Sequence, residues 1–501
     1  MKNSYTKTFA TLLISGLSLI GFGQNNLMYY MGNLPQSYYL NPATQPVCNV
    51  FISAPLMNYN LSMLNSAISP SDFFWYDSSL DSVVNPFTSN ASFNKFIDKF
   101  DKIEHATFQG GIDILSFGFR SNSMYFAFDI SAHTQQRIEY PKSLVEFITK
   151  GNTNNSVYDL SGLNFQSLNY MQFALNISKS WGDIFSVGIR PKLIYGLAAI
   201  ETQENDITLS TSTDEWQLNA HSATRIAVTG LNIPVDEDGL IDFEGDFEFD
   251  STLFDSPSNI IRTMNKNRGF GLDIGAHFKP VDQLQFSASV LNLGYIKWAD
   301  KPQSVLLDGE YTFSGAEFST SDTTDAFENI FDTLRNSMSL SGNDKPFKTG
   351  FNPVIIAGGR VFLTQRIDVG LLSRTQFYNN YTDQDFILLA NFRPLRAFSF
   401  SMSYSMLGRG YSTIGLGWSV KVGPFQSYFI SEYNPFRYDR IMKGGEPYKF
   451  DITDGFGIPA VIPVDVYGFS IRAGFNLVIG CNRAKKLRQD KPMFNSTNWM
   501  F

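Results

Sequence analysis

Ten charged or imidazole side chains share one pattern along this chain. Each falls on the polar side of a run in which apolar and polar residues alternate, and because side chains alternate faces along a strand, they belong to the face opposite the apolar one. The ten are Asp129, His133, Arg190, Lys192, Asp273, His277, Arg360, Asp368, Arg374 and Arg472. If that face lines an interior, these groups must pair with one another or meet water, since an unpaired buried charge is costly. Two interpretations stay open: a charge ladder that braces and hydrates an interior, or a path for a polar or amphiphilic solute.

The sequence predicts no catalytic residue and no cofactor. The four histidines, at positions 105, 133, 221 and 277, do not have the spacing of a zinc motif such as H-E-x-x-H. A G-x-S-x-G nucleophile elbow and a phosphate-binding loop are both missing from the sequence. We therefore expect a protein that is not an enzyme.

One acidic segment, 235–250, could contribute oxygen ligands. Asp236, Asp238 and Asp242 are candidate calcium ligands, because oxygen-rich loops with a glycine turn can hold Ca²⁺. The spacing does not complete an EF-hand loop, so a solvated acidic loop is the favoured interpretation and no metal site is predicted.

Of the two cysteines, Cys48 opens the first predicted strand and Cys481 follows the last one. In a closed barrel those strands are neighbours, and an oxidising compartment would permit a disulfide there. The alternative is two free thiols that are out of register.

The elements that would position these residues are strands. In the run from Phe270 to Phe278, Phe270, Leu272 and Ile274 point one way and Gly271 and Asp273 the other. Fourteen such segments are predicted: 48–63, 109–119, 124–139, 165–179, 184–203, 268–278, 283–296, 352–363, 366–379, 384–393, 396–407, 411–421, 424–433 and 465–479. An even number is typical of single-chain bacterial barrels.

The connections between these strands fall into two classes. Short ones rich in turn residues are predicted at 121–123, 180–183, 279–282, 363–366, 393–396 and 421–424. The connections that alternate with them are long, except for two short ones near 380–383 and 408–410. All six short turns lie at one end if the first strand runs outward, which places both chain ends in the periplasm. Two helical segments within the long connections, 92–103 and 143–151, are expected to cap the barrel mouth, with a ligand gate as the alternative.

These patterns predict an all-β fold: a transmembrane antiparallel barrel of about fourteen strands with long extracellular loops. The alternative is a soluble β-sandwich or propeller. The 46 phenylalanines and 23 tyrosines suit strands and membrane interfaces. A net charge of −8 does not suit a nucleic-acid binder, so outer-membrane lipid and other outer-membrane or periplasmic proteins are the expected partners.

The two ends of the chain differ in composition from the predicted strands between them. Residues 1–23 combine Lys2 and Lys7 with a short apolar stretch, which predicts a cleaved signal peptide; the alternative is a buried N-terminal element. Residues 24–47 are expected to plug the barrel formed by 48–480, where inward glycines such as Gly275 and Gly417 leave room for a plug. Residues 481–501 are expected to form a basic periplasmic tail.

The stretch M-G-N-L-P-Q-S-Y-Y-L-N-P-A, from Met31 to Ala43, resembles the start of an uncharacterised family of outer-membrane barrels from Bacteroidota. Its Asn41, Pro42 and Ala43 resemble the N-P-A of the hatch in the FadL-type transporter superfamily, whose relatives include barrels of the type IX secretion machinery. V-L-N-L-G-Y (290–295) is similar to a strand segment of those proteins. The resemblance implies fourteen strands and an N-terminal hatch. Transporters of hydrophobic ligands need an apolar lumen, whereas the predicted inward face is polar and charged.

The sequence thus predicts an outer-membrane barrel of a Gram-negative bacterium that binds or passes an amphiphilic or polar solute through a gated lumen. The alternative is a structural or adaptor subunit of an outer-membrane complex for secretion or assembly.

Overall fold

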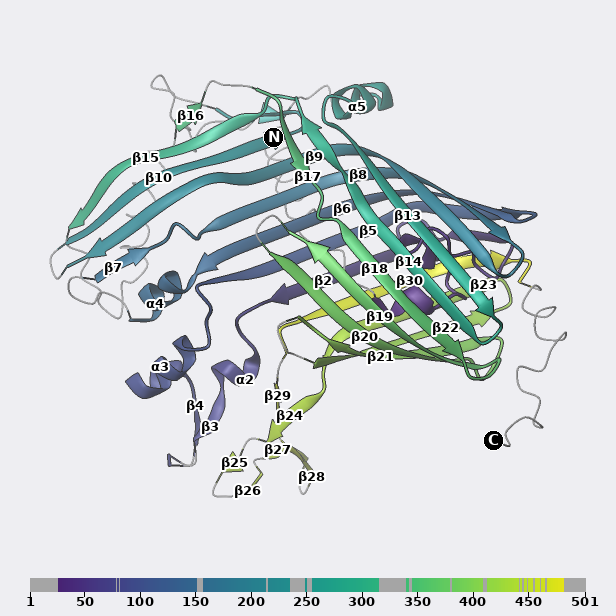
Figure 1. Ribbon diagram of the computed structural model, residues 1–501. Helices are drawn as coiled ribbons and strands as arrows, with labels where there is room; N and C mark the ends of the chain where they lie inside the picture. The colour runs from purple at the N-terminus through teal and green to yellow at the C-terminus, as the bar shows by residue number, and fades with distance from the viewer. Residues whose placement is uncertain are drawn as a thin grey trace.

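The fold is a closed antiparallel barrel of fourteen strands, with the first interrupted part-way (Figure 1). The computed structural model describes residues 26–481 except 78, 81, 151–155, 213–214, 235–247, 250–254, 315–338, 342–344, 379–380, 409–411, 441, 444–445, 448, 454–455, 460 and 465. Around the barrel the strands are β1 (Val50–Ser53) with β2 (Asn58–Asn65), β5 (Ile103–Ser121), β6 (Met124–Pro141), β8 (Asn164–Trp181), β9 (Phe185–Thr211), β13 (Arg268–Val281), β14 (Leu284–Trp298), β18 (Val354–Phe362), β19 (Ile367–Phe377), β20 (Thr382–Phe392), β21 (Phe398–Met406), β22 (Ser412–Val422), β23 (Phe425–Pro435) and β30 (Gly468–Ile479).

The barrel closes between the two ends of the chain. Both β1 and β2 pair antiparallel with β30 on one side and with β5 on the other, so the sheet has no free edge at the seam. The strand predicted over 48–63 is broken in the structure by a turn. Pro55 cannot donate a ladder hydrogen bond, and Leu56 has a φ of +57°, so pairing stops after Ser53 and resumes at Asn58.

Tight turns gather at one end of the barrel, here called the turn end (Figure 1). The long connections lie at the opposite loop end, together with two short ones between β19 and β20 and between β21 and β22. Positive φ angles at Asn122, Gly182 and Gly423 form three of the tight turns. The turn predicted at 279–282 was misplaced, because β13 continues to Val281 and the chain reverses at Asp282 and Gln283.

The outer face of the barrel is apolar and the inner face is packed. Along β21, Met402, Tyr404 and Met406 are exposed on the outside, while Ser401 and Ser403 are buried inside. The same alternation runs along β22 and β30, as the sequence predicts. A barrel with this distribution buries polar groups and presents hydrocarbon outward.

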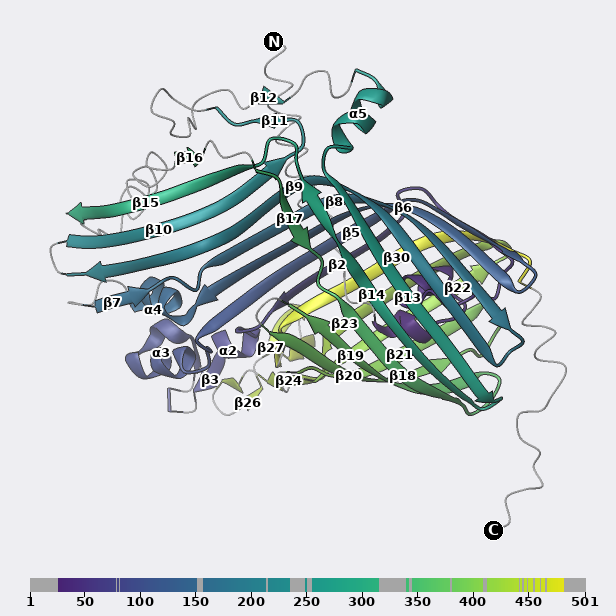
Figure 2. The ribbon, with the colours of Figure 1, turned by 45° about the horizontal axis from the view of Figure 1, so that its top comes forward.

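The long connections contain more strand than the sequence predicts. β9 is 27 residues long and continues beyond the barrel, where it pairs with β7 (Ser156–Asp159) and β10 (Glu215–Val228); β10 in turn pairs with β15 (Gln303–Ser314). Figures 1 and 2 show these strands as a curved sheet that extends past the loop end, here called the wing. Shorter strands at the loop end are β3 (Trp75–Asp77), β4 (Ser82–Val84), β11 (Leu231–Asn232), β12 (Glu248–Phe249), β16 (Ser339–Ser341), β17 (Phe347–Gly350), β24 (Arg437–Arg440), β25 (Met442–Lys443), β26 (Glu446–Pro447), β27 (Lys449–Thr453), β28 (Phe456–Pro459) and β29 (Val461–Val464).

Helices are few and lie at the loop end. They are α2 (Pro70–Phe73), α3 (Asn90–Ile97), α4 (Lys142–Lys150) and α5 (Pro257–Met264), with a 3-10 turn η3 (Pro86–Thr88). The helix predicted within 92–103 begins earlier, because Ser89 caps it by accepting the backbone N–H of Ser92. Among the described residues, none of the helices combines the length and apolar character that crossing a bilayer requires.

Candidate functional site

An N-terminal segment fills the barrel near its turn end. Residues 26–47, here called the hatch, form two 3-10 turns, η1 (Asn26–Tyr30) and η2 (Pro35–Tyr39), and the purple ribbon in Figures 1 and 2 runs inside the strands. Pro35 starts η2, and the Ser37 hydroxyl donates to the carbonyls of Met31 and Leu34 at 2.7 and 3.0 Å. Internal hydrogen bonds of this kind give the segment a defined shape of its own.

The N-P-A stretch sits where the hatch meets the wall. Asn41 Nδ2 donates to the Tyr29 hydroxyl at 2.8 Å, and Asn41 Oδ1 accepts the backbone N–H of Ala43 at 3.0 Å. The Pro42 carbonyl accepts from Asn176 Nδ2 of β8 at 3.3 Å. The three residues therefore fold a bend of the hatch and tie that bend to the barrel.

Two glycines of the wall allow this close approach. A Cβ on Gly188 would lie 2.1 Å from the Pro42 carbonyl oxygen, and one on Gly275 would lie 2.1 Å from Asn41 Oδ1. Both separations are shorter than any allowed contact, so β9 and β13 need glycine at these points.

The first group of predicted charges forms one buried network. Arg190 donates to Asp129 at 2.7 Å and to Asp273 at 3.0 Å, and Lys192 lies 2.6 Å from the second oxygen of Asp273. Two cations thus face two carboxylates, which satisfies the charges without solvent. The hatch joins this network, because the Tyr38 hydroxyl donates to Asp129 at 3.2 Å. Burial raises the pKa of Tyr38 well above its usual value, so the hydroxyl keeps its proton and remains a donor.

The remaining predicted residues also face the interior, in smaller groups. Arg360 and Arg393 share the carboxylate of Asp368 toward the turn end. Arg374 pairs with Asp385 at 3.2 Å toward the loop end. Arg472 lies 4.0 Å from Asp113. The ring of His133 stacks on Tyr170, and Nε2 of His277 lies 2.9 Å from the Thr44 hydroxyl.

Inward carboxylates that are missing from the predicted set include Asp113, Asp385 and Glu432. Glu432 holds the start of the hatch, since its two carboxylate oxygens accept the backbone N–H groups of Asn26 and Leu27 at 2.9 and 2.8 Å. Alternation along β20 and β23 would have identified Asp385 and Glu432. Asp113 lies next to a β-bulge between Asp113 and Leu115 that reverses the alternation of β5, so a regular period points it outward.

The prediction of a polar and charged inner face is wrong for part of the wall. An apolar band lies between the ion pairs of Asp368 and the Arg374–Asp385 pair. It packs with Leu27, Met28 and Leu34 of the hatch. The wall residues of the band are Leu291, Val354, Ile356, Leu372, Ile387, Leu389 and Ile430. The sequence prediction followed charged residues and passed over these inward apolar ones, which share their strands.

A cavity of about 150 Å³ remains on the loop-end side of the hatch. Its charged wall includes Arg190, Lys192 and Arg472, and its apolar wall includes Val354 and Ile356. The cavity therefore offers both hydrogen-bond donors and an apolar surface to one occupant.

The loop end of the lumen is crossed by an aromatic contact. Tyr378 and Tyr381, from the connection between β19 and β20, stack with ring centroids 4.5 Å apart. The Arg137 guanidinium of β6 lies 4.7 and 4.6 Å from the two ring centroids. Because β6 and the β19–β20 pair lie on opposite sides of the ring of strands, this contact, here called the clasp, spans the mouth.

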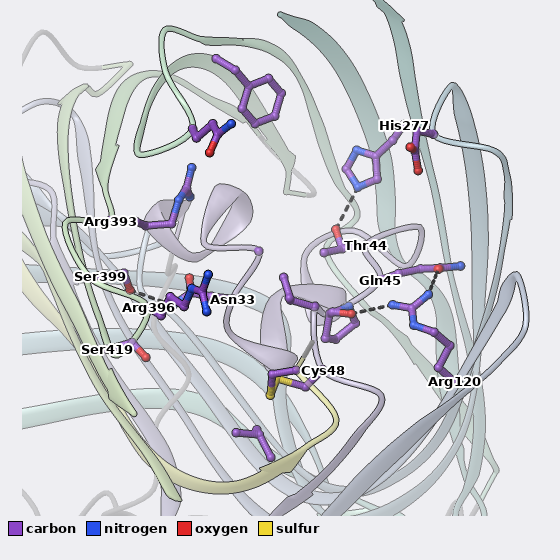
Figure 3. A pocket seen from close by; sticks show the side chains of 18 of the residues that line it. Asn33, Thr44, Gln45, Cys48, Arg120, His277, Arg393, Arg396, Ser399 and Ser419 are labelled. Atoms are coloured by element: carbon purple, nitrogen blue, oxygen red, sulfur yellow. Dashed lines mark hydrogen bonds between the residues drawn. A yellow bond between two sulfur atoms is a disulfide. The ribbon is translucent and has the colours of Figure 1, made fainter. Parts of the chain in front are cut away.

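Cys48 and Cys481 form a disulfide in the structure and lie at the turn end, beside the hatch (Figure 3). Asp236, Asp238 and Asp242 lie outside the described residues, as do the predicted signal peptide and residues 482–501 of the tail. Within the described part of the chain, histidines, cysteines and carboxylates do not gather into a group that could hold a metal ion.

Comparisons with known proteins give a family and a set of structures. A family model described as "Family of unknown function (DUF5723)" matches residues 42–432. None of the curated proteins matches the chain. Solved structures with similar folds include a deltaS2S3 mutant of TodX, a monoaromatic hydrocarbon channel of Pseudomonas putida (TM-score 0.42, 9% identity, 89% of this chain and 94% of that chain). The others are the toluene transporter TbuX of Ralstonia pickettii (0.41, 9%, 89% and 94%) and a FadL homologue of Pseudomonas aeruginosa (0.40, 9%, 90% and 94%).

Proposed function

The chain belongs to DUF5723, a family of unknown function, and we propose that it is an outer-membrane barrel that binds and passes an amphiphilic solute past a movable hatch. The outward apolar face suits hydrocarbon, and closure of the sheet pairs its backbone groups, as a bilayer requires. Tight turns at one end and long connections at the other match a barrel whose turn end faces the periplasm. On this proposal residues 1–23 are removed on export from the cytoplasm of a Gram-negative cell.

The observation that carries the proposal is the hatch, which is a separate segment buried inside a complete barrel. Leu27, Met28 and Tyr38 are fully buried, yet the hatch contributes no strand to the sheet. The barrel can therefore stay closed on itself while the hatch moves. A structural core would more simply be filled by side chains of the strands.

The chemistry of the cavity favours an amphiphile. Arg472, whose buried Nε has no hydrogen-bond partner among the described residues, can donate to a polar group on one wall, while Val354 and Ile356 on the other remove apolar surface from water. A purely hydrophobic ligand would leave the charged wall without new partners, and a purely polar one would gain nothing from the apolar wall.

A second candidate function is that of a structural subunit in an outer-membrane complex. The wing favours it: about ten residues suffice to cross a bilayer in a tilted strand, whereas β9 has 27. A sheet that projects beyond the membrane offers an extended contact surface to another protein.

Deletion of residues 26–45 distinguishes the two functions. We expect the full chain to stay closed in planar bilayers and the deletion variant to conduct, more so when Arg137→Met also removes the clasp. Gly32→Ala is the matched control, because a Cβ there meets nothing within 4 Å. If even the doubly altered barrel stays closed while proteins co-purified with the full chain are lost, the subunit function is favoured and passage is contradicted.

A further inference from the structure

A large hollow lies at the turn end, on the far side of the hatch from the lumen cavity. Its volume is about 1150 Å³, and we call it the vestibule. The hatch contributes Asn33, Thr44 and Gln45 to its inner wall, and the ends of the barrel strands surround them (Figure 3).

Cationic side chains outnumber acidic ones around the vestibule. Its lining contains six cations, which are Arg120, Lys279, Arg360, Arg393, Arg396 and Lys421. It contains two carboxylates, Asp183 and Asp282. In Figure 3, Arg393 and Arg396 lie on one side of the vestibule and Arg120 lies on the other. A water-filled hollow with this balance concentrates anions, because low-dielectric walls focus the field.

Four of the six cations already have partners. Arg120 donates to Gln45 Oε1 and to the Pro46 carbonyl, so it ties the hatch to β5. Lys279 lies 3.2 Å from Asp282. Arg360 and Arg393 share Asp368, so two positive charges meet one carboxylate. This pairing leaves a local surplus of positive charge.

Arg396 and Lys421 add to the surplus. Arg396 is exposed in the tight turn between β20 and β21, and Lys421 is near the end of β22. Among the described residues, neither side chain takes part in an ion pair. Neutral hydrogen-bonding groups lie close by: Asn33, whose Nδ2 donates to Ser399 Oγ at 2.7 Å, and Ser419.

We propose that the vestibule binds an oxyanion, a phosphate or carboxylate group, between Arg396, Lys421 and the Arg360–Arg393 pair. Guanidinium groups match such anions with paired hydrogen bonds, and the ammonium adds a point charge. The anion is either free in solution or the head group of an amphiphile, and the vestibule has room for either. The inference goes beyond solute passage, because anion binding here does not require that the hatch move.

The test is calorimetric titration of the full chain in dodecyl maltoside with inorganic phosphate, hexyl phosphate and, as the uncharged probe, hexanol. We expect an oxyanion to bind and Arg396→Gln combined with Lys421→Gln to weaken binding roughly fivefold to tenfold, as expected for two solvent-accessible charge contacts. Added salt should weaken binding as well. The matched control is Arg440→Gln with Lys345→Gln, which removes the same two charges from exposed positions at the loop end.

The outcomes separate the sources of the anion. Hexyl phosphate binding without phosphate binding assigns the site to a head group, and phosphate binding assigns it to a free oxyanion. The inference is overturned if neither anion binds, if hexanol binds as well as hexyl phosphate, or if the control variant loses as much affinity as the vestibule variant. Bilayer conductance of the deletion variant is a separate measurement, so failure of solute passage would not be mistaken for failure of anion binding.

Discussion

At the scale of single residues, the position of the hatch depends on glycines in the barrel wall. Gly188 of β9 lets the Pro42 carbonyl come so close that a Cβ would lie 2.1 Å from its oxygen. We expect Gly188→Ala to displace the Asn41–Ala43 bend while the barrel strands stay paired, because the contact is with the hatch and not with the neighbouring strand. The displaced hatch should raise bilayer conductance and expose residues 26–47 to protease.

Gly359→Ala is the matched control for this prediction. It is the same substitution in another barrel strand, but its Cβ would lie 3.4 Å from its nearest neighbour, Phe286, which is ordinary contact. If the hatch of the Gly188→Ala variant resists protease as well as the hatch of the unaltered chain does, the close approach does not hold the hatch in place.

The charged and imidazole residues show how much of the candidate site can be predicted from the sequence at this scale. Alternation alone placed all ten predicted charged and imidazole residues toward the interior, because the side-chain period of a strand is 2. It could not pair them. Asp129 and Asp273 meet at Arg190 because β6, β9 and β13 curve around one lumen, and that curvature leaves no local trace in the sequence.

At the scale of elements, the fourteen barrel strands follow from local patterns and the wing does not. β10 pairs with β9 and β15 over long stretches, and Trp216 and Leu218 on one of its faces pack with Leu209 of β9. Ser222 and Thr224 interrupt this apolar face in the middle of the strand, and the other face is mostly polar. Because the apolar alternation is interrupted, the segment resembles a polar connection until its pairing partners are known.

The seam between the first and last strands is interrupted by a turn. β1 contributes only four residues before the turn at Pro55, and the Cys48–Cys481 bond lies beside it. We expect unreduced peptide maps to contain one linked peptide holding both cysteines. Because the bond joins positions 433 residues apart, Cys48→Ser should lower the free energy of unfolding by roughly 2–4 kcal/mol.

Denaturant unfolding in detergent measures this effect, and reductant supplies the control. Reduction should shift the midpoint of the unaltered chain to that of Cys48→Ser and leave the variant where it is. Equal midpoints for all samples would mean that backbone pairing alone holds the seam closed.

At the scale of the whole molecule, polar and apolar surfaces are inverted relative to a soluble protein. Asp129, Asp273 and Asp368 are fully buried, whereas Phe270 is 53% exposed and Phe475 52% exposed. Exposed apolar residues recur on outward positions around the barrel, and soluble monomers rarely carry such a continuous apolar surface. Contact with lipid is the physical explanation that removes this surface from water.

Substitution of one exposed leucine by lysine tests that explanation. Leu388 lies midway along β20 and is 49% exposed, whereas Leu80, 56% exposed, lies in the connection between β3 and β4. If lipid covers the barrel, Leu388→Lys should cost about 2–4 kcal/mol of folding free energy in bilayers, because a cation near the midplane is poorly solvated. Leu80→Lys should cost little, since its surroundings stay aqueous. Denaturant unfolding in vesicles measures both effects, and equal effects at the two positions would contradict the membrane location. A folded monomer of the chain without residues 1–23, in buffer free of any amphiphile, would contradict it as well.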